Sequence, residues 1–345
     1  MIPIQNIYYM LSYAFQILNE QGYKNIATEQ FNNTAELMAA ILEKGIAIQL
    51  KRGLGKEYIP QTEALSSLRG KIDIAESIKT QSMLRKQLIC TYDEFSVNSI
   101  MNRIIKSTVE LLLRSNISKQ RKKNLRKLMV YFSEVDCIDL YTVNWNVQYN
   151  RNNQTYRMLI SICYLVVKGL LQTQSNGHTK LMDFLDEQQM CRLYEKFILE
   201  YYRREFKNQI TANASQIPWQ LDNEENSMLP VMQSDIMLQS GEKVLIIDAK
   251  YYEHSTQVQF DKHILHSGNL YQIFTYVKNK EYELREKDHT VSGMLLYAKT
   301  DEAIYPNNVY QMSGNQITVR TLDLNLPFDE IAGQLNTIAK THFDL

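Results

Sequence analysis

The chain is poor in residues that interrupt folded structure. Its 345 residues include only 6 prolines and 12 glycines, and no internal repeat or low-complexity tract is present. We therefore expect a chain that is folded nearly throughout, with short linkers. With 44% apolar and 22% charged residues, the composition is that of an ordinary globular protein, and the length is sufficient for two domains.

Cysteine is scarce, and the four cysteines never form a CxxC pair. This spacing argues against a structural zinc site and a disulfide framework, and it favours a reducing, cytoplasmic location. The chain also lacks net charge, because its 38 basic and 38 acidic side chains cancel. Overall charge therefore identifies neither a nucleic-acid-binding protein nor an enzyme for acidic substrates, and any such function must come from local patches.

Long apolar runs are absent as well. The most apolar internal stretch, residues 159–171, is about 13 residues long and contains Lys168, whereas a membrane-spanning helix needs about 20 apolar residues. The first 15 residues lack a basic n-region and a small-residue cleavage site, which predicts no signal peptide. We expect a soluble protein with no membrane partner.

The pattern of apolar residues predicts a two-domain α+β protein. In the first part of the chain, helical spacing predicts helices at about 6–19, 34–45, 98–114 and 157–171. Residues 46–92 instead break into short apolar pieces separated by Gly and Pro, which favours a β-rich module. The hexapeptide 172–177 (QTQSNG) is the best linker candidate, so we expect domains at 1–175 and 176–345.

In the second domain, helix and strand patterns alternate. They predict helices at about 190–206 and 265–279 and strands near 231–238, 243–248 and 291–297. Such alternation favours a mixed sheet flanked by helices.

One strand of this domain ends in an acid and a base. In VLIIDAKYY, residues 244–252, Asp248 and Lys250 are two positions apart and project to the same face. Asp235 lies 13 residues upstream on another apolar strand, and the connection 239–242 is hairpin-like. The two carboxylates are therefore expected to converge and bind Mg²⁺, beside a lysine suited to phosphodiester hydrolysis. The alternative is a surface hairpin with an Asp–Lys pair of little energetic consequence.

Asp235 and the Asp248-Ala249-Lys250 triplet resemble the PD-(D/E)xK nuclease pattern, with Ser234 in place of the proline. The resemblance implies a mixed αβ core, with Asp235 and Asp248 as metal ligands and Lys250 orienting water or stabilising the transition state. Downstream, Gln272-x-x-x-Tyr276 is similar to the QxxxY helix of nuclease subfamilies related to RecB. Its i, i+4 spacing places both side chains on one helical face, able to reach a DNA backbone or the metal-site lysine.

Longer stretches extend the resemblance over almost the whole chain. They are residues 2–15 (IPIQNIYYMLSYAF), 68–78 (LRGKIDIAESI), 92–108 (YDEFSVNSIMNRIIKST) and 193–206 (LYEKFILEYYRREF). Together they resemble the McrC family, the nuclease subunits of modified-cytosine-dependent McrBC restriction systems. The resemblance implies a Mg²⁺-dependent endodeoxyribonuclease, with Mn²⁺ as a substitute, that acts on methylated double-stranded DNA. It also implies that cleavage requires an McrB-like AAA+ GTPase ring, which the N-terminal domain of the nuclease subunit enters and stimulates. Cleavage of both strands implies a dimer of the nuclease subunit.

Further site residues are open to two interpretations. Related nucleases often add a carboxylate from a helix, and here Glu195 competes for that role with Glu200 on the opposite edge of the same helix. His263 and His266 form an HxxH, but no third His or Cys ligand is near in sequence, so zinc is not expected. We expect His266 to contact phosphate or to pack.

The chain lacks a nucleotide-binding loop of its own. The nearest candidate, Gly53-Leu54-Gly55-Lys56-Glu57, has neither the upstream glycine nor the hydroxyl of a P-loop, so we expect no bound nucleotide. Basic residues of the β-rich module (Lys51, Arg52, Arg69 and Lys71) are either partner or DNA contacts or ordinary surface charges. The densest basic run, residues 119–127, is either a solvated helix face or a phosphate-contacting patch.

Two alternatives to this function remain. The chain could be an inactive adaptor, a DNA clamp that only stimulates the partner GTPase, although a clamp does not require the Asp, Asp, Lys set. It could also be the nuclease of a related restriction system with an unmodified target, because target choice is expected to lie in the partner chain.

Overall fold

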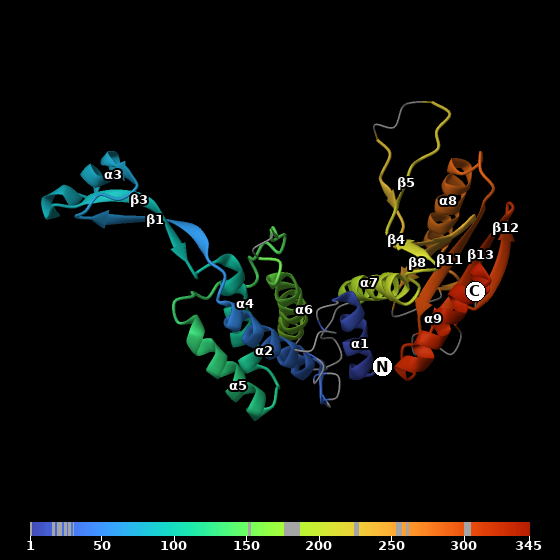
Figure 1. The fold of residues 1–345 in the computed structure, drawn as a ribbon, viewed down its shortest axis with the longest axis horizontal. Coiled ribbons are helices and arrows are strands. Elements are labelled where there is room, and N and C mark those ends of the chain that lie inside the picture. The colour runs from blue at the N-terminus through green and yellow to red at the C-terminus, as the bar shows by residue number, and fades with distance from the viewer. Residues whose placement is uncertain are drawn as a thin grey trace. The chain divides into compact units, whose positions relative to one another are not determined.

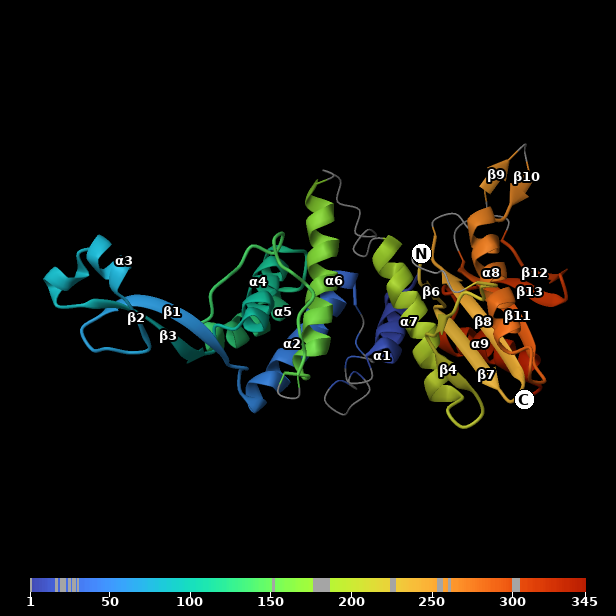
Figure 2. The same cartoon turned by 90° about the horizontal axis from the view of Figure 1, so that it is seen from above.

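The computed structural model describes residues 2–15, 18, 23, 26, 29, 31–150, 153–175, 187–223, 228–252, 257–259, 262–299 and 305–345. The chain divides into two compact units, shown in Figures 1 and 2. We call residues 1–31 and 185–345 the sheet unit, and residues 32–184 the arm unit. This differs from the expected division, because the first helix belongs to the sheet unit. The expected linker at 172–177 is wrong for residues 172–175, which belong to the helix Tyr156–Ser175, and residues 176 and 177 lie outside the described residues.

A mixed six-stranded sheet forms the centre of the sheet unit, in the order β12-β13-β11-β8-β7-β4. Its strands are β4 (Thr211–Asn213), β7 (Ile236–Ser240), β8 (Lys243–Lys250), β11 (Thr290–Ala298), β12 (Asn308–Met312) and β13 (Asn315–Leu322). The strands β8, β11 and β13 run parallel, whereas β4, β7 and β12 pair antiparallel with their neighbours. The predicted strands at 243–248 and 291–297 are confirmed.

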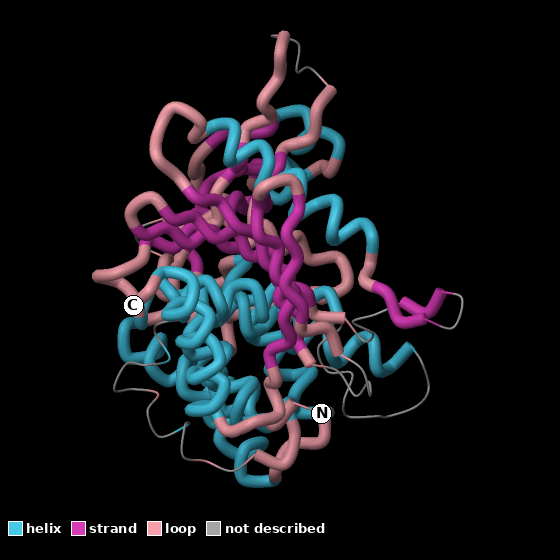
Figure 3. Tube along the Cα trace, turned by 90° about the vertical axis from the view of Figure 1, so that its right-hand side faces the viewer, coloured by secondary structure: helices cyan, strands magenta, loops and turns pink. Residues whose placement is uncertain are grey.

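Helices lie on both sides of this sheet (Figure 3). They are α7 (Glu187–Glu205), α8 (Ser267–Glu283) and α9 (Phe328–Phe343). Helix α8 joins β8 to the parallel strand β11 and packs on both, as a crossover helix does. Its buried residues Ile273 and Val277 meet Val244 and Ile246 of β8 and Leu295 of β11 in one apolar cluster. The predicted mixed sheet with flanking helices is confirmed.

Two short antiparallel pairs lie outside the main sheet. Strands β5 (Gln216–Ile217) and β6 (Met232–Gln233) pair with each other, as do β9 (Gln257–Gln259) and β10 (Lys262–Ile264) between β8 and α8. The predicted strand at 231–238 is therefore interrupted, because Ser234 and Asp235 separate β6 from β7.

The first helix, α1 (Ile4–Ala14), packs in the sheet unit although the sequence analysis placed it in the other domain. It contacts α7 along its length. The buried Asn6 donates hydrogen bonds of 2.7 and 2.8 Å to the carbonyls of Leu324 and Leu326, and the Tyr9 ring stacks on Phe328 with centroids 4.4 Å apart. These partners are more than 300 residues away in sequence, so the periodicity of α1 alone could not reveal them.

Four helices form the body of the arm unit. They are α2 (Thr34–Arg52), α4 (Ile100–Arg114), α5 (Lys119–Met129) and α6 (Tyr156–Ser175). Asn33, Ser99 and Ser118 cap the first three, each accepting a backbone N–H. The expected end of α2 near Gly45 is wrong, since the helix continues to Arg52 and is capped by Gly53, whose φ is +91°. A mid-helix glycine costs only about 1 kcal/mol, which the burial of Leu42 and Ile46 on either side outweighs.

Residues 57–96 lie between α2 and α4 in the sequence. They form the second part of the arm unit, which we call the β arm. It contains β1 (Glu57–Leu65), β2 (Lys71–Asp73), helix α3 (Ile74–Lys79), the 3₁₀ turn η3 (Ser82–Arg85) and β3 (Leu88–Ser96), with β3 between β1 and β2. The predicted β-rich module is confirmed, but it begins at residue 57 rather than 46 because α2 extends to Arg52.

Among the described residues, no helix combines the length and apolarity that crossing a bilayer requires.

The base of the β arm is fixed by a buried polar network. Asn102 on α4 donates to the carbonyls of Gly55 and Val97, at 2.9 and 2.8 Å, and so bridges the two chain segments that enter and leave the arm. The Tyr156 hydroxyl accepts from Gly55 N at 2.6 Å and donates to Asn102 Oδ1 at 2.8 Å. Because Asn102 is fully buried and Tyr156 nearly so, this network holds the arm to the helical body.

Replacing Gly70 in the arm by alanine is expected to unpair β2 from β3. Gly70 has a φ of +68°, and an added Cβ would lie 2.3 Å from the Thr91 carbonyl oxygen and 2.7 Å from Tyr92 Cβ. Backbone strain and the steric clash together should lower the stability of the β2–β3 pairing by about 2 to 3 kcal/mol. Gly53→Ala is the matched control, since its φ is also positive but nothing lies within 4 Å. Hydrogen exchange at residues 88–96 should accelerate in Gly70→Ala only; equal exchange in both variants would contradict the steric argument.

Candidate active site

A tight hairpin brings two carboxylates of the sheet unit together. Strands β7 and β8 pair antiparallel from Ser240↔Lys243 to Ile236↔Ile247. The two-residue turn between them begins with Gly241 at φ +57°, a conformation that glycine adopts readily. Continuing this register places Asp235 opposite Asp248, on the side of the sheet that α8 covers. The predicted hairpin is confirmed.

Asp248 and Lys250 form a close ion pair at the end of β8. Lys250 Nζ lies 2.9 Å from Oδ1 and 2.8 Å from Oδ2 of Asp248, but hydrogen-bond geometry is satisfied only at Oδ1. The Asp248 side chain is 1% exposed, and its Oδ2 has no hydrogen-bond donor among the described residues. Within the described part of the chain, Oδ2 is therefore held by the ion pair with Lys250 and accepts no hydrogen bond.

The electrostatic environment of this pair is unusual. Burial, the largest influence, raises the pKa of Asp248 to about 7, against the opposing effect of Lys250. The negative charge of the nearby Asp235 raises it further. Burial opposes the charge of Lys250, but the attraction of Asp248 outweighs it, so the pKa of the lysine is raised. Shifts of this kind on both members of a buried pair are typical of functional sites.

Asp235 is half-buried just before β7. Its Oδ2 accepts a hydrogen bond of 2.9 Å from the backbone N–H of Ala249, the residue between Asp248 and Lys250. This bond joins the Asp235 side chain to the backbone of β8. The structure therefore brings Asp235, Asp248 and Lys250 together, as the sequence predicts.

Helix α8 adds two polar side chains in a chain of hydrogen bonds. Lys250 Nζ donates to Gln272 Oε1 at 3.4 Å, and Gln272 Nε2 donates to the Tyr276 hydroxyl at 2.9 Å. As their i, i+4 spacing predicts, Gln272 and Tyr276 share a helical face and reach the lysine, Gln272 directly and Tyr276 through Gln272.

Of the two competing acids on α7, Glu195 is the one near this cluster. Burial raises the pKa of Glu195 to about 7, and Asp235 raises it further while Lys250 and Arg192 lower it. Glu200 instead forms an ion pair of 2.7 Å with Arg203, one helical turn away. Only Glu195 thus lies within electrostatic reach of Asp235 and Lys250.

His266 lies at the N-terminal end of α8 and packs against Tyr252, with ring centroids 5.5 Å apart. The side chain of His263 lies outside the described residues. Tyr252 begins a cluster that the sequence analysis missed. Buried Asn269 donates to the Tyr297 hydroxyl at 2.9 Å and accepts from the Tyr252 hydroxyl at 3.5 Å.

This cluster adjoins the site because Tyr297 on β11 is the register partner of Lys250. Burial raises the pKa of Tyr297 to about 12, and Asp248 contributes to the shift. The position of Tyr252, two residues after Lys250 on the same strand side, was a usable signal in the sequence. The parallel pairing that brings Tyr297 there has no local signature.

The donor set suits a hard divalent cation better than zinc. Two converging carboxylates, one with a buried oxygen that lacks a donor, are the oxygen ligands that Mg²⁺ takes together with water. Within the described part of the chain, no three His, Cys, Asp or Glu side chains form a metal-binding group. The site is thus an open two-carboxylate arrangement rather than a closed metal cage.

Comparison with known proteins relates the chain to components of one kind of restriction system. The family model described as "McrBC 5-methylcytosine restriction system component" matches residues 5–298. The chain is 30% identical over 329 residues to the type IV methyl-directed restriction enzyme EcoKMcrBC of Escherichia coli K12, covering 94% of this chain and 93% of that protein. A solved structure of Thermococcus gammatolerans McrB AAA+ hexamers with bound McrC contains a chain of similar fold. It has a TM-score of 0.51 at 18% identity, with 97% of this chain and 76% of that one covered.

Proposed function

The chain belongs to the family of McrBC 5-methylcytosine restriction system components, and from this membership we propose that it is the DNA endonuclease subunit of a methylcytosine-dependent restriction complex. The observation that carries the proposal is the convergence of Asp235, Asp248 and Lys250 at one edge of the sheet. The Asp248 carboxylate is buried and its Oδ2 accepts no hydrogen bond beside the ion pair with Lys250, which leaves that oxygen available to a cation.

Asp235 and Asp248 are the residues that would hold Mg²⁺, with Mn²⁺ as a substitute. Bound there, the cation would neutralise charge on the scissile phosphate and lower the pKa of a water. Lys250 stays protonated beside Asp248 and is held by Gln272, so its ammonium can orient the attacking water or stabilise the charged transition state. Glu195, whose pKa is about 7, can take up or release a proton at neutral pH.

The side chains around this centre suit DNA contacts. Gln272 holds Lys250 and is itself held by the buried Tyr276 hydroxyl, so Tyr276 acts behind Gln272 rather than at the surface. His266 is supported by the Tyr252 ring and is suited to a backbone contact. We assign these residues to positioning the lysine and the substrate, with a second copy of the chain needed to cut the opposite strand.

The partner in this proposal is an AAA+ GTPase of the McrB kind. The archaeal McrC in the solved assembly is bound to McrB AAA+ hexamers, and this chain lacks a P-loop of its own. Supporting evidence is the number of large apolar side chains that are exposed on the β arm, which is typical of a protein contact. Its exposed residues include Tyr58, Leu68, Ile74, Ile78, Leu84 and Phe95.

Reconstitution tests this function directly. The full chain is mixed with the AAA+ protein encoded beside it, and cleavage of methylated and unmethylated plasmid is measured with Mg²⁺ and GTP. Cleavage of methylated plasmid alone would support the proposal. Cleavage of both would identify a related system with an unmodified target, and GTPase stimulation without cleavage would identify an inactive adaptor.

Metal binding should strengthen as the pH rises through about 7. Carboxylates bind metal only when ionised, and the pKa of Asp248 is raised to about 7 by burial. About one-tenth of such a group is ionised at pH 6 and about nine-tenths at pH 8, so Mn²⁺ affinity should rise roughly tenfold. Calorimetric titration of the full chain at both pH values measures this. An equal affinity at pH 6 and pH 8 would show that Asp248 does not control binding.

A further inference from the structure

The neutral net charge of the chain conceals a strong separation of charge between its two units. Residues 32–184 contain 22 lysines and arginines and 13 acids, which gives the arm unit a net charge of +9. Because the whole chain has 38 of each kind, the sheet unit carries −9. The unit with the candidate active site therefore repels a polyanion by its overall charge, and the other unit attracts one.

The positive charge is densest on α5. From residue 111 to residue 133 the chain has seven basic residues and no acid. At 100° per residue, five of them cover an arc of about 140° on α5, away from the buried Leu125. These five, which we call the α5 basic face, are Lys119, Lys122, Lys123, Arg126 and Lys127.

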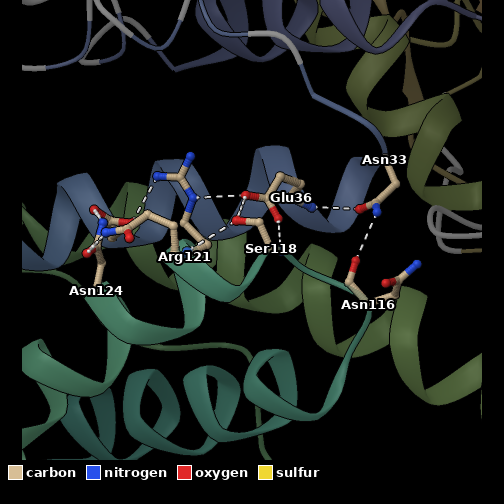
Figure 4. Close-up of polar contacts among 8 residues, drawn as sticks. Asn33, Glu36, Asn116, Ser118, Arg121 and Asn124 are labelled. Carbon is tan, nitrogen blue, oxygen red and sulfur yellow. Dashed lines mark hydrogen bonds and ion pairs between the residues drawn. The ribbon is translucent and has the colours of Figure 1, made fainter.

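The sixth basic residue of α5, Arg121, has a separate and internal role (Figure 4). Its guanidinium bonds Glu36 at 3.2 Å and Glu43 at 2.9 Å, both on α2. Ser118 N and Oγ also donate to Glu36, and Asn124 donates to Glu43. The acids that face α5 from α2 are thus already paired, and among the described residues the α5 basic face forms no ion pair.

Helix stability does not explain this face. Lys119 and Lys123, and Lys123 and Lys127, are like charges at i, i+4, which destabilises a helix by a few tenths of a kcal/mol per pair. Lys119 also stands in the first turn, where the helix dipole disfavours a cation. Ordinary solvated faces mix both signs, so a ligand of opposite charge is the better account of this one.

Further basic and aromatic side chains lie around α5. Lys44 of α2 and Lys127 line one hollow between the two helices, together with Glu43, which is paired with Arg121. Directly after α5, in the 3₁₀ turn η4 (Val130–Phe132), the Tyr131 side chain is 67% exposed. Basic side chains interspersed with an exposed aromatic ring are typical of surfaces that bind a nucleic-acid backbone.

We propose that the α5 basic face binds the phosphate backbone of duplex DNA, so that the arm unit holds the DNA that the sheet unit cuts. This inference rests on the proposed nuclease function, because a negatively charged catalytic unit needs a second, positive surface to retain its substrate. Duplex DNA fits better than an acidic protein, because the α5 basic face consists of lysine and arginine alone, whereas most of the exposed large apolar side chains of this unit lie on the β arm.

The test is DNA binding by the full chain in EDTA, which separates binding from cleavage. Fluorescence anisotropy measures the affinity for an unmethylated 30-base-pair duplex over a range of NaCl concentrations. In the triple variant Lys119→Gln, Lys123→Gln, Lys127→Gln we expect binding about tenfold weaker or more at low salt. The slope of log K against log salt should also fall by about 2 to 3, because each phosphate contact contributes about 0.9.

A charge-matched triple variant, Lys79→Gln, Arg85→Gln, Lys86→Gln, serves as the control. These residues are exposed on the β arm of the same unit, and the control should bind DNA as the wild type does. Equal DNA binding by both variants overturns the inference, and so does a loss confined to co-sedimentation with the AAA+ partner, which would identify a protein contact. Wild-type DNA binding without cleavage in the reconstituted complex would instead count against the nuclease function alone.

Discussion

Replacing Asp248 by asparagine is expected to lower DNA cleavage by the reconstituted complex by about 10³-fold or more. The amide keeps the shape of the carboxylate but removes the negative charge that a divalent cation needs at this buried position. Lys250→Met, which keeps length and removes the ammonium, should cause a loss of similar size. The measurement is the rate of methylated plasmid cleavage with Mg²⁺ and GTP.

Two controls separate this loss from misfolding. Asp288→Asn makes the same chemical change at an exposed residue and should cleave at the wild-type rate. Both site variants should also stimulate the partner GTPase normally, because the β arm is unchanged. Cleavage by Asp248→Asn at the rate of Asp288→Asn would remove the proposed mechanism.

Arg121→Ala is expected to destabilise the arm unit by about 2 to 4 kcal/mol. The guanidinium is 15% exposed and lies between Glu36 and Glu43, which are 11% and 22% exposed. Removing it leaves two partly buried carboxylates near each other without a cation. The retained hydrogen bonds from Ser118 to Glu36 and from Asn124 to Glu43 offset this cost only in part. Denaturant unfolding of the full chain, followed by hydrogen exchange in α2 and α5, measures the effect.

Lys123→Ala on the same helix is the matched comparison. Lys123 is exposed and forms no ion pair within the described residues, so its loss should change stability by less than about 0.5 kcal/mol. The pair of variants thus distinguishes the internal arginine of α5 from the basic face. If both variants had equal stability, the Glu36–Arg121–Glu43 network would have no stabilising role.

The reactive part of the site could be predicted from sequence because it depends on local geometry. Asp248 and Lys250 share a face since side chains alternate along a strand, and Gln272 and Tyr276 share one since a helix repeats every 3.6 residues. Asp235 was placed opposite Asp248 by a short hairpin, which the sequence also indicates. The strand alternation, the helical repeat and the hairpin turn can each be recognised from a few neighbouring residues, without knowledge of the rest of the molecule.

Other features depend on partners that are distant in the chain. The sequence does not reveal that Tyr297 stands beside Lys250, because parallel strands are joined by a crossover and their register is set by packing against α8. The choice between Glu195 and Glu200 likewise required the position of α7 against β8. The helix predicted over 34–45 extends past Gly45, because the buried residues on either side of the glycine stabilise it there.

The sequence by itself determined the periodic faces of the helices and strands, the Asp, Asp, Lys set, and the absence of a P-loop. Only the tertiary structure decided that α1 joins the sheet unit, that Arg121 turns inward while Lys123 stays exposed, and that a neutral chain separates into units of +9 and −9. The physical reason is that alternation and helical period follow from covalent geometry within a few residues. Burial, ion pairing and charge separation depend instead on which distant segments pack together.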